Sequence, residues 1–161
     1  MWALAVFVCL FIWHEVDEYR VLIPWLASNE NRLPTRLARM RMNHQQFTVI
    51  ALQQLVLILL IGLLAPPLWV KAMVVAYLVH LLLHCAQLVF TWVKGYFLPL
   101  YSAVLQVPLI AILLWFMRPP LDGVEAFAEL LIPSGILVIV MFANLGIMNF
   151  LVRRAFNRKT S

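Results

Sequence analysis

The chain has 161 residues, of which 65% are hydrophobic and 12% are charged, and its mean hydropathy is +0.94. This composition lies far outside the range of a soluble domain and predicts one polytopic membrane unit. The formal net charge of +5 does not indicate a nucleic-acid partner, because the basic residues fall in short segments between apolar runs, where they carry topology information.

Five apolar stretches are long enough, or nearly long enough, to cross a hydrocarbon core, which needs about 20 residues. They run approximately over residues 2–23, 47–65, 68–93, 97–117 and 130–152. Pro66-Pro67 joins the second stretch to the third, which leaves room only for a tight helical hairpin. We therefore predict an all-α fold, a polytopic helical membrane bundle of about five transmembrane helices in a single domain over residues 1–161.

Lysine and arginine predict the orientation of this bundle. The segments after the first, third and fifth spans are basic, and they share one side of the membrane if the amino terminus is outside. The positive-inside rule then places the carboxy terminus in the cytoplasm, which suits a bacterial inner (plasma) membrane. Two of these segments are an amphipathic stretch over 32–43, expected in the inner interface, and a basic cytoplasmic tail over 153–161. The basic residues of the first of them are Arg32, Arg36, Arg39 and Arg41.

A run of ionisable side chains ends the first apolar stretch. On a helix, residues three and four apart share a face, so His14, Asp17 and Glu18 project together, with Glu15 about 100° round from His14. Each charged group costs roughly 2.5 to 3.5 kcal/mol near a bilayer centre if it is unpaired, so the default interpretation is a functional site. Two plainer interpretations stay open: the interfacial end of a short helix, and a structural salt bridge to Arg20.

The third span holds His80 and His84, which lie one above the other on a single helix face, a spacing used by metal ligands. His14 and His80 each lie twelve positions after the start of their predicted spans, roughly 18 Å from the outer edge at 1.5 Å per residue. Glu18 and His84 then lie together, roughly 24 Å from that edge. Because the two spans run in the same direction, the two motifs are predicted to face each other.

Other polar groups have weaker signals. His44, at the head of the second span, is expected near 31 Å, about a turn or more deeper than the other candidates, where it either caps the site from below or sits in water. Asn144 on the fifth span and Gln53 and Gln106 on the second and fourth are most simply interhelical hydrogen-bonding groups.

Several motifs occur in order along most of residues 10 to 115. They are His14-x-x-Asp17-Glu18, Pro24-Trp25, His80-x-x-x-His84 with Gln87, and Gly95-Tyr96-x-x-Pro99 before an apolar helix with Pro108. This series resembles the HXXEE-domain integral membrane proteins. The resemblance implies a small helical membrane protein with an active site and no settled reaction. Asp17 departs from the name motif by replacing its first Glu, which shortens the reach of that carboxylate by a methylene, and Leu100 replaces an expected Gly.

The first function hypothesis is a membrane-embedded metalloenzyme. Imidazoles and carboxylates give a mixed nitrogen and oxygen set suited to zinc or iron, and a carboxylate that does not bind the metal could act as general base on water. A hydrolase acting on a lipid-like or amphiphilic substrate is favoured over a di-iron oxygen-dependent enzyme, because membrane desaturases and hydroxylases carry more than the four histidines found here. The candidate ligands are His14, Asp17, Glu18, His44, His80 and His84, and the candidate catalytic carboxylates are Glu15 and Glu18.

Two other hypotheses use the same polar groups. An intramembrane transport or binding protein would use them as a relay for protons or cations, and a chain this short without a recognisable inverted repeat would have to form a homo-oligomer. A scaffold protein would use them only to join helices, which requires about five intramembrane ionisable groups to exist for packing alone. Membrane lipids are the expected partners under every hypothesis.

Overall fold

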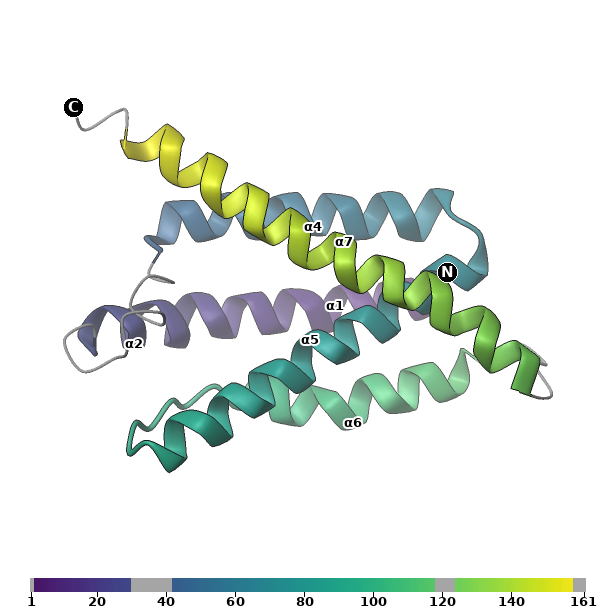
Figure 1. Cartoon of the computed structure of the whole chain (residues 1–161), viewed down its shortest axis with the longest axis horizontal. Coiled ribbons are helices and arrows are strands. Elements are labelled where there is room, and N and C mark those ends of the chain that lie inside the picture. Colours follow the sequence, from purple (N-terminus) through teal and green to yellow (C-terminus); the bar gives the residue numbers. More distant parts are fainter. Residues whose placement is uncertain (1, 30–41, 118–123, 158–161) are drawn as a thin grey trace.

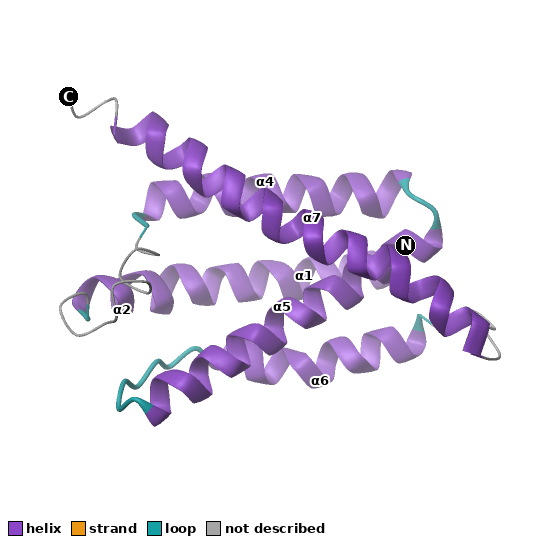
Figure 2. Cartoon of the chain, viewed as in Figure 1, coloured by secondary structure: helices purple, strands orange, loops and turns teal. Residues whose placement is uncertain are grey.

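The computed structural model describes residues 2–29, 42–117 and 124–157, and over these ranges the regular structure is helical without strands, which confirms the all-α prediction (Figure 1; Figure 2). The predicted amphipathic stretch lies outside the described residues except for positions 42 and 43, and so do positions 158–161 of the basic tail. The elements are α1 (Trp2–Asp17), a π-helical turn η1 (Glu18–Leu22), α2 (Ile23–Ser28), α4 (His44–Leu64), α5 (Pro67–Val93), α6 (Tyr101–Phe116) and α7 (Val124–Asn157).

Helix length and hydropathy indicate a membrane protein. Within the described ranges, three stretches are long and apolar enough to cross a bilayer: His44–Leu64, Pro67–Val93 and Ala128–Ala155, with mean hydropathies of 2.5, 2.0 and 2.3. Helix α6 is equally apolar but has only 16 residues. The other predicted span, at the amino terminus, is a continuous helical run through α1, η1 and α2.

Helix α5 is the central helix of the bundle. Within its apolar stretch 39% of the residues are buried inside the protein, against 17% for α4 and 11% for the stretch in α7. It packs against α6 and α7 and also touches α4, whereas α1 lies between α4 and α6 (Figure 1). The main core forms where these helices meet, around Phe7, Tyr77, Leu81, Ala103 and Ile110. The outward faces of α4 and α7 stay apolar and exposed, as lipid contact requires.

The helical run at the amino terminus changes its hydrogen-bond register at η1. The N–H of Ile23 donates to the carbonyl of Glu18, five residues earlier. The next residue, Pro24, has no N–H to donate to the preceding turn, so the regular ladder is interrupted there in any case. A widened turn just before the proline keeps the run helical, and Glu18 is its first residue. Single π-helical turns of this kind are frequent at functional sites.

Local capping explains where α4 begins and ends. The Asn43 side chain accepts from the N–H of Gln46 at 2.8 Å, and the Gln46 side chain accepts from the N–H of Asn43 at 3.1 Å. This capping box starts the helix at His44, three residues before the apolar run that was predicted to open it. The helix ends at Leu64, ahead of Pro66, and Pro67 is the first residue of α5.

The connection from α5 to α6 is anchored on α2. Gly95 has a φ of 78°, and the amides of Gly95 and Tyr96 donate back to the carbonyls of Trp92 and Thr91, which completes a Schellman motif. The chain is then not helical until Tyr101, four residues later than predicted. It is held there because Trp25 Nε1 donates to the Phe97 carbonyl at 2.7 Å. Leu98 and Leu100 are buried in this connection and pack with Leu88, Leu22 and Trp25.

Candidate metal centre

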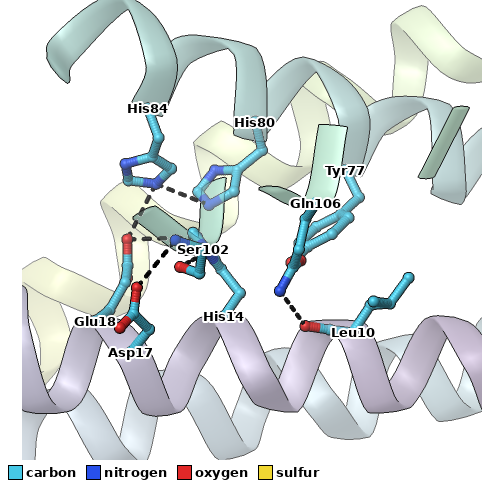
Figure 3. A network of polar contacts seen from close by, with 9 residues as sticks. All are labelled: Leu10, His14, Asp17, Glu18, Tyr77, His80, His84, Ser102 and Gln106. Atoms are coloured by element: carbon cyan, nitrogen blue, oxygen red, sulfur yellow. Dashed lines mark hydrogen bonds and ion pairs between the residues drawn. The ribbon is translucent and has the colours of Figure 1, made fainter. Parts of the chain in front are cut away.

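Two pairs of side chains, one from the junction of α1 and η1 and one from α5, face each other in the core (Figure 3). One donor atom each from His14, Glu18, His80 and His84 lies within 4.8 Å of all the others, and we call these residues the four-donor cluster. His84 Nε2 is 3.0 Å from His80 Nε2 and 3.1 Å from Glu18 Oε1. His14 Nε2 is 3.5 Å from the same Glu18 oxygen. The donors therefore point at one small volume.

The four-donor cluster contains too few N–H groups to satisfy its own nitrogen and oxygen atoms. His14 is fully buried and Glu18 is 8% exposed. Among the described residues, neither His14 Nε2 nor Glu18 Oε1 has a hydrogen-bond partner, although His84 Nε2 is close to the Glu18 oxygen. Buried polar atoms are seldom left unsatisfied, and a neutral imidazole has only one N–H to give. A bound cation would satisfy all four groups at once, so the cluster could hold a metal ion.

Helix α6 orients the first ligand of the four-donor cluster. His14 Nδ1 lies 3.2 Å from Ser102 Oγ, which is itself buried. With the Nδ1 proton donated to this hydroxyl, Nε2 keeps its lone pair and directs it into the cluster, the tautomer that metal binding needs. The backbone N–H of Ser102 in turn donates to Asp17 Oδ2 at 3.2 Å. Asp17 thus caps the first turn of α6 from the neighbouring helix.

A second polar chain fixes the spacing of the three helices beside the four-donor cluster (Figure 3). Tyr77 donates its hydroxyl proton to Gln106 Oε1 at 2.9 Å, and Gln106 Nε2 donates to the Leu10 carbonyl at 3.0 Å. Gln106 is fully buried, and these two bonds satisfy both ends of its amide. The Tyr77 ring stacks on His80 and meets the edge of His14, with ring centroids 6.0 and 6.1 Å apart. The histidine rings are therefore held by both packing and hydrogen bonds.

The structure brings together four of the predicted site residues and places the others elsewhere. Asp17 is turned to α6, as described above. The His44 ring contacts the Tyr19 ring at a centroid distance of 4.5 Å and lies outside the four-donor cluster. Glu15 lines a cavity that it shares with His80. Among the described residues, exposed Arg20 forms no ion pair with Asp17 or Glu18, so the structural salt bridge is not found.

Sequence reasoning did not identify Ser102 and Tyr77 as supports of this site, and it gave Gln106 only a general hydrogen-bonding role. Two signals point to them. Tyr77 lies three residues before His80 and so shares its helix face. Ser102 is a small polar residue in the first turn of a mostly apolar helix, where a buried hydroxyl needs a partner. Neither signal says which histidine the side chain would meet.

Comparison with known proteins gives one match. A family model described as "Protein of unknown function with HXXEE motif" matches residues 5–115. The search of curated proteins and the search of solved structures found no match. The matched region contains the whole four-donor cluster, both polar chains that support it and most of α6.

Proposed function

The chain belongs to the HXXEE family, and we propose that it is a membrane-embedded, metal-dependent hydrolase that acts on a lipid-like or amphiphilic substrate. One observation carries the proposal: three imidazoles and a carboxylate converge within 4.8 Å in the core of an apolar bundle. Packing alone would favour apolar side chains at these positions, because each buried polar group must be compensated.

The donor set fits zinc or iron. Imidazole nitrogens and carboxylate oxygens are the usual protein ligands of both metals, and catalytic zinc sites commonly use three protein ligands. His14, His80 and His84 would hold the ion through their Nε2 atoms, and Glu18 is close enough to be a fourth ligand. Four donors among the described residues suit one ion better than two. A metal in such a set supplies Lewis acidity for the attack of water on an ester or amide.

The carboxylates supply the acid–base chemistry in this proposal. Glu18 Oε1 faces His14 and His84 and would accept a proton from the attacking water if it is not itself a ligand. Glu15 follows His14 on α1, about 100° further round the helix, and lines the adjacent cavity. It is the second candidate for this role. Ser102 acts as a positioning residue, since it holds His14 rather than touching the reacting atoms.

Metal analysis of the purified full chain tests the proposal. Protein never exposed to chelator should carry close to stoichiometric zinc or iron. His80→Ala and His84→Ala should each lose this metal while helix content stays unchanged, because each variant removes one convergent imidazole. His44→Ala is the matched control, since it removes a histidine outside the four-donor cluster and should keep the metal. Substoichiometric metal in the parent protein would refute the proposal.

A second function, proton or cation passage, is favoured by one feature of the same cluster. Distances of 3.0, 3.1 and 3.5 Å link His80 to His84, His84 to Glu18 and Glu18 to His14, close enough to pass a proton from one group to the next. A relay of this kind would need a homo-oligomer or further path residues to cross the membrane. Flux measurements in vesicles separate the two functions, because a relay predicts proton movement that His84→Ala abolishes in protein that never contained metal.

A further inference from the structure

A cavity of about 110 Å³ lies beside the four-donor cluster, between α1, α4, α5 and α7. All four helices contribute a polar residue at one end of it. These residues are Glu15, Gln54, His80 and Asn144. His80 belongs to both the cavity and the four-donor cluster, so a group held at this end is next to a metal-binding imidazole.

The same four helices line the other end of the cavity with apolar side chains. These are Phe7, Ile61, Met73 and Leu137, each seven or eight positions from the polar residue of its own helix. At 1.5 Å per residue, the two ends are roughly 10 to 12 Å apart. A staggered hydrocarbon chain with C–C bonds of about 1.5 Å would place about eight carbons along this length. The cavity is therefore amphiphilic along its axis.

The polar end is held in place by an amide cluster between α4 and α7. Gln53 and Asn144 exchange two hydrogen bonds, of 3.2 and 3.1 Å, and Gln54 Nε2 donates to Gln53 Oε1 at 3.0 Å. This pairing joins the two helices that form the outer wall of the cavity. Because Gln54 and Asn144 also line the cavity, its wall carries fixed amide dipoles at the end where Glu15 and His80 lie.

The cavity also adjoins a route to the bilayer. An apolar groove of about 270 Å³ lies between α1 and α4, and it shares Phe11 and Glu15 with the cavity. Several other groove residues, among them Ile12, Val16 and Leu52, are exposed on the outside of the bundle. A chain that leaves the lipid phase along this groove would reach the cavity at Glu15, beside its polar end.

From these observations we propose that the cavity binds the single hydrocarbon chain of the substrate, a medium-chain amphiphile with a neutral ester or amide head. The chain tail lies between Phe7 and Met73, and the head lies between Glu15 and His80. A neutral head fits this end because the residues that line the cavity include no lysine or arginine to pair with the carboxylate of a fatty acid. This inference rests on the proposed hydrolase function, whose substrate class it makes specific.

Photolabelling tests the proposal with the full chain in phosphatidylcholine vesicles. The probe is 1-octanoylglycerol with a diazirine at the end of its chain. We expect saturable labelling at Phe7, Ile61, Met73 or Leu137, displaced by unlabelled 1-octanoylglycerol. Ala76 lies between the two ends on α5 and is 4% exposed, so Ala76→Phe fills the cavity. It should weaken labelling about tenfold, equivalent to about 1.4 kcal/mol, because the added ring occupies volume that the hydrocarbon chain needs.

Controls keep the result interpretable. Leu82→Phe adds a comparable ring on the same helix at a position that is 49% exposed and outside the cavity, and it should leave labelling unchanged. Ala76→Leu is a milder filling that applies if Ala76→Phe loses helix content. Labelling that is spread over lipid-facing positions, or equal with a two-chain phosphatidylcholine probe, overturns the proposal. Labelling that Ala76→Leu and Ala76→Phe both leave unchanged does the same.

Metal content is measured in the same samples, so the two proposals fail separately. Stoichiometric metal without labelling of the cavity removes the chain-binding inference and leaves the metalloenzyme standing. Labelling of the cavity in protein without metal supports a hydrocarbon-binding site and refutes the hydrolase.

Discussion

Replacing Ser102 with Ala tests whether α6 organises the candidate metal centre. The variant removes the hydroxyl that lies 3.2 Å from His14 Nδ1 and changes nothing in the four-donor cluster itself. His14 could then rotate or carry its proton on Nε2, the atom that would bind the metal. Loss of such an outer hydrogen bond typically lowers metal affinity 10- to 100-fold, so we expect a loss of about 1.4 to 2.7 kcal/mol.

The assay is competition for zinc with a chromophoric chelator, using the full chain in detergent. Ser102 is 3% exposed, and alanine is smaller by one atom, so the fold should survive and the helix content should match that of the parent. Ser28→Ala is the matched control. Its hydroxyl donates to two carbonyls of its own helix and accepts from the neighbouring Asn29 side chain, so the variant should keep the parent affinity. An unchanged zinc affinity in Ser102→Ala would show that His14 does not depend on α6 and would refute the reasoning.

Three further predictions concern stability, measured by thermal unfolding in detergent. Asp17→Ala should lower the free energy of unfolding by about 1 kcal/mol because it removes the cap of α6, and Asp17→Asn should lower it much less. Metal content should stay unchanged in both variants, whereas metal loss in Asp17→Asn would make Asp17 a ligand. Gly62→Ala places a Cβ against the Leu4 side chain and should lower the free energy of unfolding by about 1 to 3 kcal/mol. Adding Leu4→Ala to this variant should recover part of the loss, and strict additivity of the two changes would contradict the close contact. Asn144→Leu should cost about 1 kcal/mol for two interhelical bonds. Gln53→Leu added to it should cost less than the first change, because it removes the amide that Asn144→Leu left unpaired and breaks only the bond from Gln54; a second loss as large as the first would argue against reciprocal pairing.

The sequence predicted the partners within the four-donor cluster better than it predicted their surroundings. Helical spacing alone puts His14 with Glu18 and His80 with His84, and the matched distances along two parallel spans put the pairs level with each other. Both arguments need only the regular rise and twist of a helix, together with successive spans that cross the membrane in opposite directions. They do not depend on which helices are neighbours.

The direction of Asp17 could not be derived in this way. It shares a helix face with His14 by spacing, yet its carboxylate bonds to the first turn of α6. That outcome depends on where α6 begins, which is set in turn by the Gly95 turn and by the bond from Trp25 to the Phe97 carbonyl. The departure from the family motif is understandable here, because aspartate is among the best capping residues and the position lies outside the four-donor cluster.

His44 and α6 show two other limits. Depth arithmetic placed His44 about a turn or more beyond the other candidates, and its ring packs on Tyr19, a contact that an apolar pattern does not specify. Helix α6 is shorter than its apolar run because residues 97–100 are used to bind the connection to α2. In both cases a tertiary contact overrides what hydropathy alone suggests.

The cap on α6 also bears on how the protein is made. The acceptor for the Ser102 amide comes from a residue synthesised 85 positions earlier. A nascent α6 inserted by itself would leave that amide without a partner in hydrocarbon, at a cost of several kcal/mol. We therefore expect the opening segment to serve as a template on which the later helix docks during biogenesis. A chain translated without its first 20 residues should then be degraded by membrane proteases although its remaining spans are intact.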